Sequence, residues 1–274
     1  MSTDARPVDA VRRLRHIVRS RLSEYPALYL PLARRRYPGP SPEVIGPDTE
    51  LVIDGYTRSA STFAVYAFQL AQDRPVRLAH HLHAPAQLLR AARTGVPALV
   101  LIREPQGTVL SQVVREPGVA VRDALVSYTR FYSRLMPWRD RFVVADFSEV
   151  TSDFGAVVRR LNARFGTSFR EFEHSEVAMR ECFELIERRG TLSRTQLGFE
   201  SGLATLDEVR REQRDPARVA TLVDSAQAWV PSADRQRSTA GLRQRWQEDD
   251  LAALRDRADL VYRAFLDGSG AGRD

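Results

Sequence analysis

Two parts of this chain place an arginine and hydroxyl side chains directly after an apolar run. In the first, the run Leu51 to Ile53 is followed by a turn and an amphipathic stretch from Phe63, which predicts a strand, a loop and a helix. The donors in the loop and first helical turn are Arg58, Ser59, Ser61 and Thr62. Because a helix N-terminus adds free N–H groups and a positive dipole end, the segment predicts an oxyanion site. Ordinary N-capping by serine or threonine is the alternative for this segment taken alone.

The second part begins with Pro97 to Ile102, an apolar run of buried-strand length, and continues with Arg103. Ser111 follows within an expected helix that returns it to the side of Arg103. An arginine beside a hydroxyl binds a terminal phosphate well. A surface salt bridge is the alternative for Arg103 considered alone.

Three of the five histidines lie between these two parts, at His80, His81 and His83. If residues 76–82 form a strand, alternation places His81 and His83 on one face and His80 on the other. Because histidine titrates near neutral pH, one of them at a strand's carboxyl end suits a general base. Histidines that only make structural hydrogen bonds are an alternative. A zinc site is disfavoured, since no acidic or cysteine partner has suitable spacing.

The wider pattern alternates expected strands with expected helices. The strands are 51–53, 76–82, 97–102 and 142–146, and the helices include 8–22, 85–93, 121–134 and 154–165. This order predicts an α/β fold with a central parallel sheet, right-handed crossovers and helices on its faces.

We expect one domain in three parts. Residues 1–48 form an N-terminal helical and loop segment, 49–170 the α/β core, and 171–274 a helical region that completes the same domain. The polar stretch 189–216 is interpreted as a flap.

The charge of the chain narrows its chemistry. The net charge is +6, and all 41 basic residues are arginine, so no P-loop lysine exists. An anionic ligand is therefore held by arginine, histidine, hydroxyls or backbone. The arginines are spread along the chain without a nucleic-acid motif, so we expect no nucleic-acid partner. Residues 8–22 predict a helix with a basic face, for which solvation is favoured over peripheral contact with an acidic membrane.

Other features point to an ordinary cytosolic protein. One cysteine, Cys182, excludes an internal disulfide and a cysteine metal cluster. There is no run of about 18 apolar residues and no apolar signal core. We therefore expect a cytoplasmic location.

The three loops together resemble those of sulfotransferases that use 3′-phosphoadenosine 5′-phosphosulfate (PAPS). The segment 58–63, Arg-Ser-Ala-Ser-Thr-Phe, is similar to the family's Lys/Arg-Ser-Gly-Thr-Thr-Trp, with Ala60 in place of glycine. Segment 103–105, Arg-Glu-Pro, followed by Ser111, resembles the family's Arg-Asn/Asp-Pro and its later serine. Segment 81–85, His-Leu-His-Ala-Pro, resembles Lys-Thr-His-Leu-Pro.

This resemblance implies a P-loop NTPase-like fold and a role for each matched residue. The 5′-phosphosulfate would be bound by the loop residues Arg58, Ser59, Ala60, Ser61 and Thr62, with Phe63 near the adenine. Arg103 and Ser111 would hold the 3′-phosphate, and Arg237 is a weaker match to a late basic segment of the family. His83 would be the catalytic base, while His81 replaces a lysine and Arg58 also stabilises the leaving group. If the family's glycine needs a positive φ, Ala60 is strained.

The function that follows is transfer of a sulfonyl group from PAPS to a hydroxyl or amine, without a metal. The acceptor could be a small molecule, a carbohydrate or a lipid-linked compound. Aromatic residues at 128–138 could line its pocket, although their helical spacing is more typical of a core. Two alternatives stay open: a metal-dependent P-loop-like small-molecule kinase, and a non-catalytic basic nucleotide-binding protein.

Overall fold

The computed structural model describes residues 7–36, 43–116, 118–188, 194–214 and 240–268. Its centre is a sheet of four parallel strands, β1 (Leu51–Gly55), β2 (Leu78–His80), β3 (Ala98–Ile102) and β4 (Val143–Asp146). Their order across the sheet is β2-β1-β3-β4, so the α/β prediction is confirmed. Since the chain moves from β1 to β2 on one side and then to β3 on the other, the carboxyl ends of β1 and β3 flank a topological switch point. Ligands of open parallel sheets bind at such a point.

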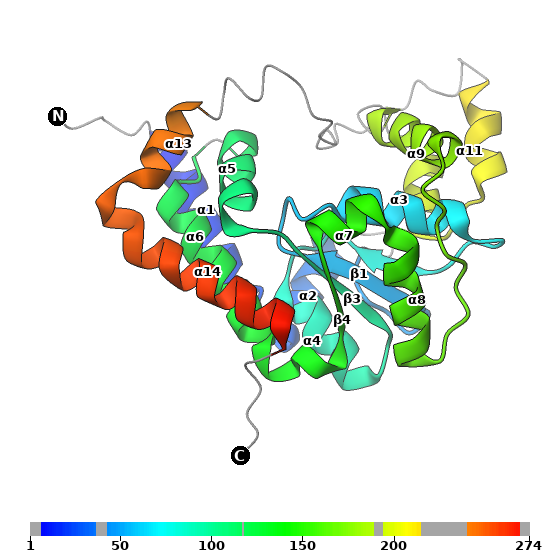
Figure 1. Ribbon diagram of the computed structural model, residues 1–274, viewed down its shortest axis with the longest axis horizontal. Coiled ribbons are helices and arrows are strands. Elements are labelled where there is room, and N and C mark those ends of the chain that lie inside the picture. Colours follow the sequence, from blue (N-terminus) through cyan, green and yellow to red (C-terminus); the bar gives the residue numbers. More distant parts are fainter. Residues whose placement is uncertain (1–6, 37–42, 117, 189–193, 215–239, 269–274) are drawn as a thin grey trace.

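Helices cover both faces of this sheet (Figure 1). One layer contains α2 (Pro26–Arg36), α4 (Pro85–Thr94), α5 (Pro105–Arg115), α6 (Val121–Leu135), α13 (Ala240–Gln247) and α14 (Ala252–Asp267). The other contains α3 (Ser61–Ala71), α7 (Phe147–Ser152), α8 (Phe154–Phe165), α9 (Glu176–Arg188), α10 (Arg194–Glu200) and α11 (Leu206–Gln213). The remaining elements are α1 (Pro7–Leu22) and two 3₁₀ helices, η1 (Met136–Arg141) and η3 (Asp249–Leu251).

The strands alternate between two apolar cores. Val52 and Val100 point to the α4–α6 side, whereas Ile53 and Leu101 point to the α3–α8 side. Because both faces are covered, the strands are apolar along almost their whole length, as parallel strands commonly are. Side chains of α2 and α14 enter the first core, where α2 packs against α4 and α14 packs against α6. Among the described helices, none combines the length and the apolar character that crossing a membrane requires.

The second strand is shorter than the expected range 76–82. It ends at His80 because His81 and His83 adopt φ values of 55° and 49°, which interrupt the extended backbone. The predicted alternation of side chains therefore fails beyond His80.

The interpretation of 189–216 as a flap fails around Glu200. Residues 194–213 contain α10 and α11, and Glu200 and Ser201 are fully buried. This segment lies along the free edge of β2, where the Leu78 N–H donates to the Ser201 carbonyl at 3.3 Å. Residues 189–193, 215 and 216 lie outside the described residues.

Gly202 is required where this segment meets the sheet. Its φ is +71°, and a Cβ atom there would lie 1.9 Å from the Val76 carbonyl oxygen. We expect Gly202→Ala to lower the free energy of unfolding by about 2–4 kcal/mol, measured by urea denaturation. Gly95→Ala is the control, because Gly95 has φ +76° but nothing within 4 Å of its added Cβ. Equal losses in both variants would show that backbone strain, and not the close approach, sets the cost.

Candidate active site

A cavity of about 1000 Å³ opens at the carboxyl ends of β1 and β3, the edge that the topology singles out. All predicted site residues except Ser59 and Arg237 line it. These are Arg58, Ala60, Ser61, Thr62, Phe63, His81, His83, Arg103 and Ser111. Arg58 and Ser111, 53 positions apart in the sequence, thus meet in one site, where the Arg58 Nε donates to the Ser111 hydroxyl at 3.0 Å.

Two predicted residues are placed differently. Ser59 is fully buried and does not reach the cavity wall, so its side chain lies beneath the loop. Arg237 lies outside the described residues. Arg243, in the middle of α13, lines the cavity and was missed by the sequence analysis. Its signal was weak because it is one arginine among 41.

The loop between β1 and α3 presents the start of the helix to the cavity. Ala60 is the N-cap of α3, with φ 66° and ψ 20°, and its side chain makes no capping bond. The Ser61 hydroxyl is buried and has no hydrogen-bond partner among the described residues. A helix start with uncapped N–H groups and an unused buried hydroxyl is suited to an anion that would satisfy both.

Backbone strain is concentrated around this site. The four non-glycine residues with positive φ in the described chain are Arg58, Ala60, His81 and His83, and all four line the cavity. Such conformations cost about 1–2 kcal/mol each and commonly mark functional sites. The strain expected at Ala60 is therefore present, and three neighbours share it.

Substituting Ala60 with glycine tests that strain directly. We expect Ala60→Gly to stabilise the protein by about 0.5–1 kcal/mol, because glycine adopts φ 66° freely while adding some entropy to the unfolded chain. Chemical denaturation measures the change. A loss of stability would mean that the alanine methyl group contributes more by packing than its backbone costs.

His83 is held in an orientation that suits proton acceptance. Its Nδ1 lies 2.9 Å from the Gly55 carbonyl oxygen, which can only accept, so Nδ1 carries the proton. The neutral ring then leaves its Nε2 lone pair available. A carboxylate oxygen of Asp54 lies 3.4 Å from the same Nδ1 and would stabilise the imidazolium formed by protonation.

The buried Asp54 side chain holds the His83 loop in place, and the sequence analysis did not identify this residue. Its side chain is fully buried and accepts bonds from the backbone N–H groups of Gly55 (2.9 Å) and His83 (3.1 Å). The Gln87 amide also donates to it at 3.1 Å. The available signal was a charged residue ending an apolar strand, since buried carboxylates are rare unless they are paired.

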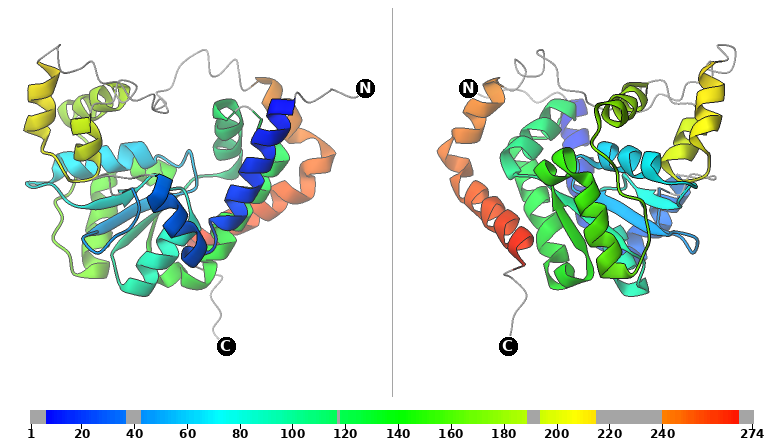
Figure 2. Two further views of the ribbon diagram at one scale, coloured as in Figure 1. Left: turned by 180° about the vertical axis from the view of Figure 1, so that it is seen from behind. Right: turned by 45° about the vertical axis from the view of Figure 1, so that its right-hand side comes forward.

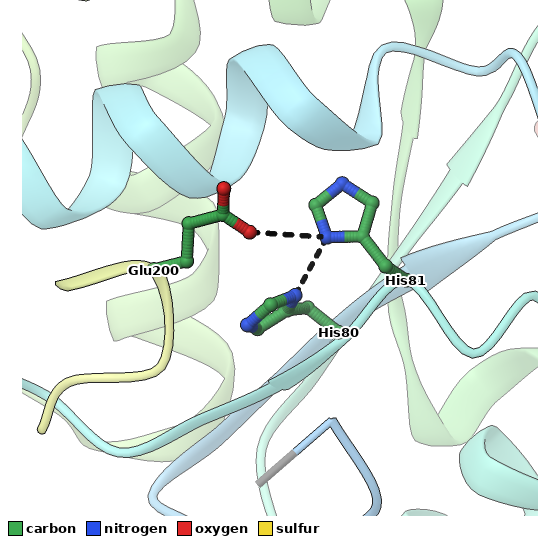
Figure 3. Close-up of side chains that lie close together, drawn as sticks. All are labelled: His80, His81 and Glu200. Carbon is green, nitrogen blue, oxygen red and sulfur yellow. Dashed lines mark hydrogen bonds and ion pairs between the residues drawn. The ribbon is translucent and has the colours of Figure 1, made fainter. Parts of the chain in front are cut away.

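His81, the second histidine that lines the cavity, belongs to a buried polar cluster with His80 and Glu200 (Figure 3). Its Nδ1 lies 2.6 Å from Nδ1 of His80 and 4.0 Å from a Glu200 carboxylate oxygen, and its Nε2 lies 3.2 Å from the Thr62 hydroxyl. Tyr66 donates to the other Glu200 oxygen at 2.6 Å. The Glu200 carboxylate thus lies within ion-pair distance of the His81 ring.

The same cluster corrects one premise of the sequence analysis, because an acidic partner is present after all. Ligand atoms of His80, His81 and Glu200 lie within 4.8 Å of one another, close enough to surround a cation. However, two nitrogens on a tetrahedral zinc ion are about 3.3 Å apart, given bonds of 2.0–2.1 Å. The 2.6 Å between the imidazole nitrogens is a hydrogen-bond distance, so the arrangement is one that shares a proton.

The outer wall of the cavity is apolar and comes from α9 and α7. It is formed by Met179, Phe183, Ile186 and Phe147. The Arg103 guanidinium lies over the Phe147 ring, 4.2 Å from its centroid, and 3.4 Å from the Glu104 carboxylate. One side of the cavity is thus cationic and hydroxylic, and the other suits a flat apolar group.

A smaller cavity of about 70 Å³ adjoins the large one and shares Thr57 and His83 with it. Its walls include His16 and Ser20 of α1 and Glu116. Burial lowers the pKa of His16, with Glu116 opposing the shift. His83 therefore stands between a large cationic cavity and a small polar one.

The aromatic residues considered for an acceptor pocket are mostly core. Tyr128 and Tyr132 are fully buried, and burial raises the pKa of both hydroxyls. Phe131 borders the smaller cavity, whereas the Trp138 ring lies beneath Arg93.

Comparisons with known proteins find a likeness to solved structures alone. No protein-family model matches the chain, and no curated protein matches its sequence. Among solved structures, it is similar to mouse sulfotransferase SULT7A1 complexed with PAP, with 11% identity and a TM-score of 0.38. The alignment covers 80% of this chain and 92% of that chain. At this level of similarity, the function has to be argued from the site itself.

Proposed function

We propose that this protein is a PAPS-dependent sulfotransferase with His83 as general base. The observation that carries the proposal is the pairing of two features in one cavity. One is the uncapped start of α3 beside Arg58 and Ser61, which suits an anion. The other is His83, whose ring is oriented by Gly55 with Nε2 as the available base.

The charge and the aromatic wall of the larger cavity support PAPS as the donor. Arg58, Arg103 and Arg243 outnumber its one acidic residue, Glu104, as a nucleotide with several negative charges requires. The 5′-phosphosulfate would lie against the start of α3, and the 3′-phosphate near Arg103 and Ser111. Phe63 is 7% exposed and packs against Phe183, and both rings line the cavity. The adenine would lie against these two rings.

The reaction needs one proton acceptor and a stabilised leaving group. The acceptor oxygen attacks sulfur, the bond from sulfur to the bridging phosphate oxygen breaks, and the acceptor's proton moves to Nε2 of His83. The bridging oxygen keeps the electron pair of the broken bond, so the 5′-phosphate of the departing adenosine 3′,5′-bisphosphate gains one negative charge, and the sulfonate on the acceptor carries another. Arg58, the N–H groups of α3 and His81 beside Glu200 would stabilise the charge on the 5′-phosphate.

The acceptor would enter through the smaller cavity, because His83 lines that cavity and none of the residues assigned to the donor does. Its 70 Å³ holds only a small part of an acceptor, such as one hydroxyl or amine and its neighbouring atoms. A small molecule, a carbohydrate or a lipid-linked compound all meet that requirement.

Arg103 provides a test of the donor. We expect Arg103→Ala to weaken binding of adenosine 3′,5′-bisphosphate by about 10–100-fold, because a charged hydrogen bond to the 3′-phosphate is lost. Binding of 5′-AMP should change less than threefold, about 0.6 kcal/mol. Isothermal titration calorimetry measures both, and equal losses would remove Arg103 from the 3′-phosphate site.

A thermal-shift titration separates the proposal from its rivals. A sulfotransferase is stabilised by adenosine 3′,5′-bisphosphate without a metal, whereas a kinase of this fold requires ATP and magnesium. The missing P-loop lysine counts against the kinase. A non-catalytic basic protein would show no stabilisation by either nucleotide and no turnover.

A further inference from the structure

Helix α1 turns its apolar side chains away from the protein. Val11, Leu14 and Val18 are 67%, 62% and 47% exposed, and Ile17 is 36% exposed. At about 100° per residue these side chains share one side of the helix. A surface helix normally buries its apolar stripe, whereas α1 exposes its apolar stripe to solvent.

The inner side of α1 is polar instead. Arg13 forms an ion pair with Asp123 of α6 at 2.6 Å, and His16 lies 2.9 Å from the Ser127 hydroxyl of the same helix. Polar contacts therefore fix the orientation of α1 and hold its apolar side outward.

The next helix adds to the same exposed surface. In α2, Leu28 and Leu32 are 57% and 50% exposed, while Leu30 and Ala33 enter the core. Seen from behind, α1 and α2 both lie in front of the rest of the chain (Figure 2, left). We call the exposed apolar residues of these two helices the outer face: Val11, Leu14, Ile17, Val18, Leu28 and Leu32.

The charge of the chain is concentrated in these two helices. Residues 7–36 contain eight arginines and two acidic residues, an excess equal to the net charge of +6 of the whole chain. The rest of the sequence is therefore electrically balanced. Arg15, Arg21 and Arg35 of these helices are exposed beside the outer face.

We propose that the outer face docks on the surface of an anionic lipid bilayer. Apolar side chains flanked by arginines are the pattern of a helix that lies in the membrane interface, where the apolar groups enter the acyl boundary and the guanidiniums bind anionic headgroups. A second copy of the chain would bring two equally positive surfaces together. Nucleic acid would bind the arginines but leave the apolar side chains in water.

Docking would also bring the membrane close to the smaller cavity, since His16 and Ser20 line that cavity from the inner side of α1. This step rests on the proposed function and points to a lipid-linked acceptor. Membrane docking itself does not depend on sulfonyl transfer, because it is measured without substrate.

The test is co-sedimentation of the full chain with vesicles of phosphatidylcholine and phosphatidylglycerol, beside vesicles of phosphatidylcholine alone. We expect binding to the anionic vesicles only, weakening as salt is raised. The combined variant Val11→Ser, Leu14→Ser, Val18→Ser should bind roughly 100-fold more weakly. The matched control is Val177→Ser with Leu260→Ser, which removes two side chains that are 69% and 68% exposed on other helices. It should bind like the original protein.

Three results would overturn the proposal. One is no binding of the original protein to anionic vesicles. Another is equal vesicle binding by the triple serine variant. The third is that the original protein forms a dimer or binds DNA under conditions in which it does not bind the vesicles. Unchanged thermal stability of the serine variant shows that it is folded, as expected for substitutions of exposed residues.

Discussion

Replacing His83 with asparagine should lower kcat by about 10²–10⁴-fold, the usual range for a lost general base. Asparagine tolerates the left-handed backbone that His83 adopts at φ 49°, and its amide N–H can donate to the Gly55 carbonyl as Nδ1 does. The substitution therefore keeps the loop but removes the basic nitrogen. Steady-state kinetics with PAPS and a working acceptor measures the loss.

Donor binding is the control for this variant. Affinity for adenosine 3′,5′-bisphosphate should stay within about threefold, or 0.6 kcal/mol, since the proposed role of His83 is toward the reacting hydroxyl and not toward the nucleotide. Normal turnover in His83→Asn would exclude His83 as the base and leave His81 or a carboxylate for that role. If the variant lost both nucleotide binding and turnover, the result would instead indicate that the loop around residue 83 had lost its structure.

Replacing Asp54 with asparagine should lower kcat by on the order of 10²-fold, with little change in donor affinity. The Asp54 carboxylate lies 3.4 Å from Nδ1 of His83 and would stabilise the charged ring that the proposed reaction forms. The variant should also lose about 1–3 kcal/mol of stability. The Asp54 side chain accepts hydrogen bonds from three N–H donors, and the NH₂ group of asparagine would place a further donor against them.

Gln87→Ala separates these two effects. Gln87 donates to Asp54 at 3.1 Å but carries no charge, so its loss disturbs the same network without removing the carboxylate. We expect Gln87→Ala to lower stability and to leave kcat within about threefold, or 0.6 kcal/mol. Equal kcat losses in both variants would show that Asp54 acts only by supporting the fold around it.

Much of the fold followed from the pattern of the sequence. Apolar runs of strand length and amphipathic helical stretches predicted the parallel sheet and most helices around it, and the capped ends of α4 and α8 agree closely with the expected ranges. The motif loops predicted which side chains share a cavity, because loops after parallel strands open at one edge of the sheet. Arg58 and Ser111 are in contact as a result.

The errors have specific causes. The second strand was predicted too long because residues 76–82 alternate suitably, whereas the left-handed backbone at His81 depends on tertiary contacts that sequence alone does not reveal. The flap was predicted from polarity, but Glu200 is buried by pairing with Tyr66. Asp54 and Arg243 gave no spacing signal, since their roles arise only when distant segments meet.

The segment that follows α10 has a further consequence for the behaviour of the sheet. β2 is an outer strand, and an outer strand offers unpaired N–H and C=O groups that can template a strand from another molecule. The Ser201 carbonyl accepts a hydrogen bond from one of these groups, the Leu78 N–H. Gly202 lies too close to Val76 for an incoming chain to pair there. Residues 201–202 thus block strand addition at the β2 edge, so detaching this segment would open a route to polymerisation through that edge.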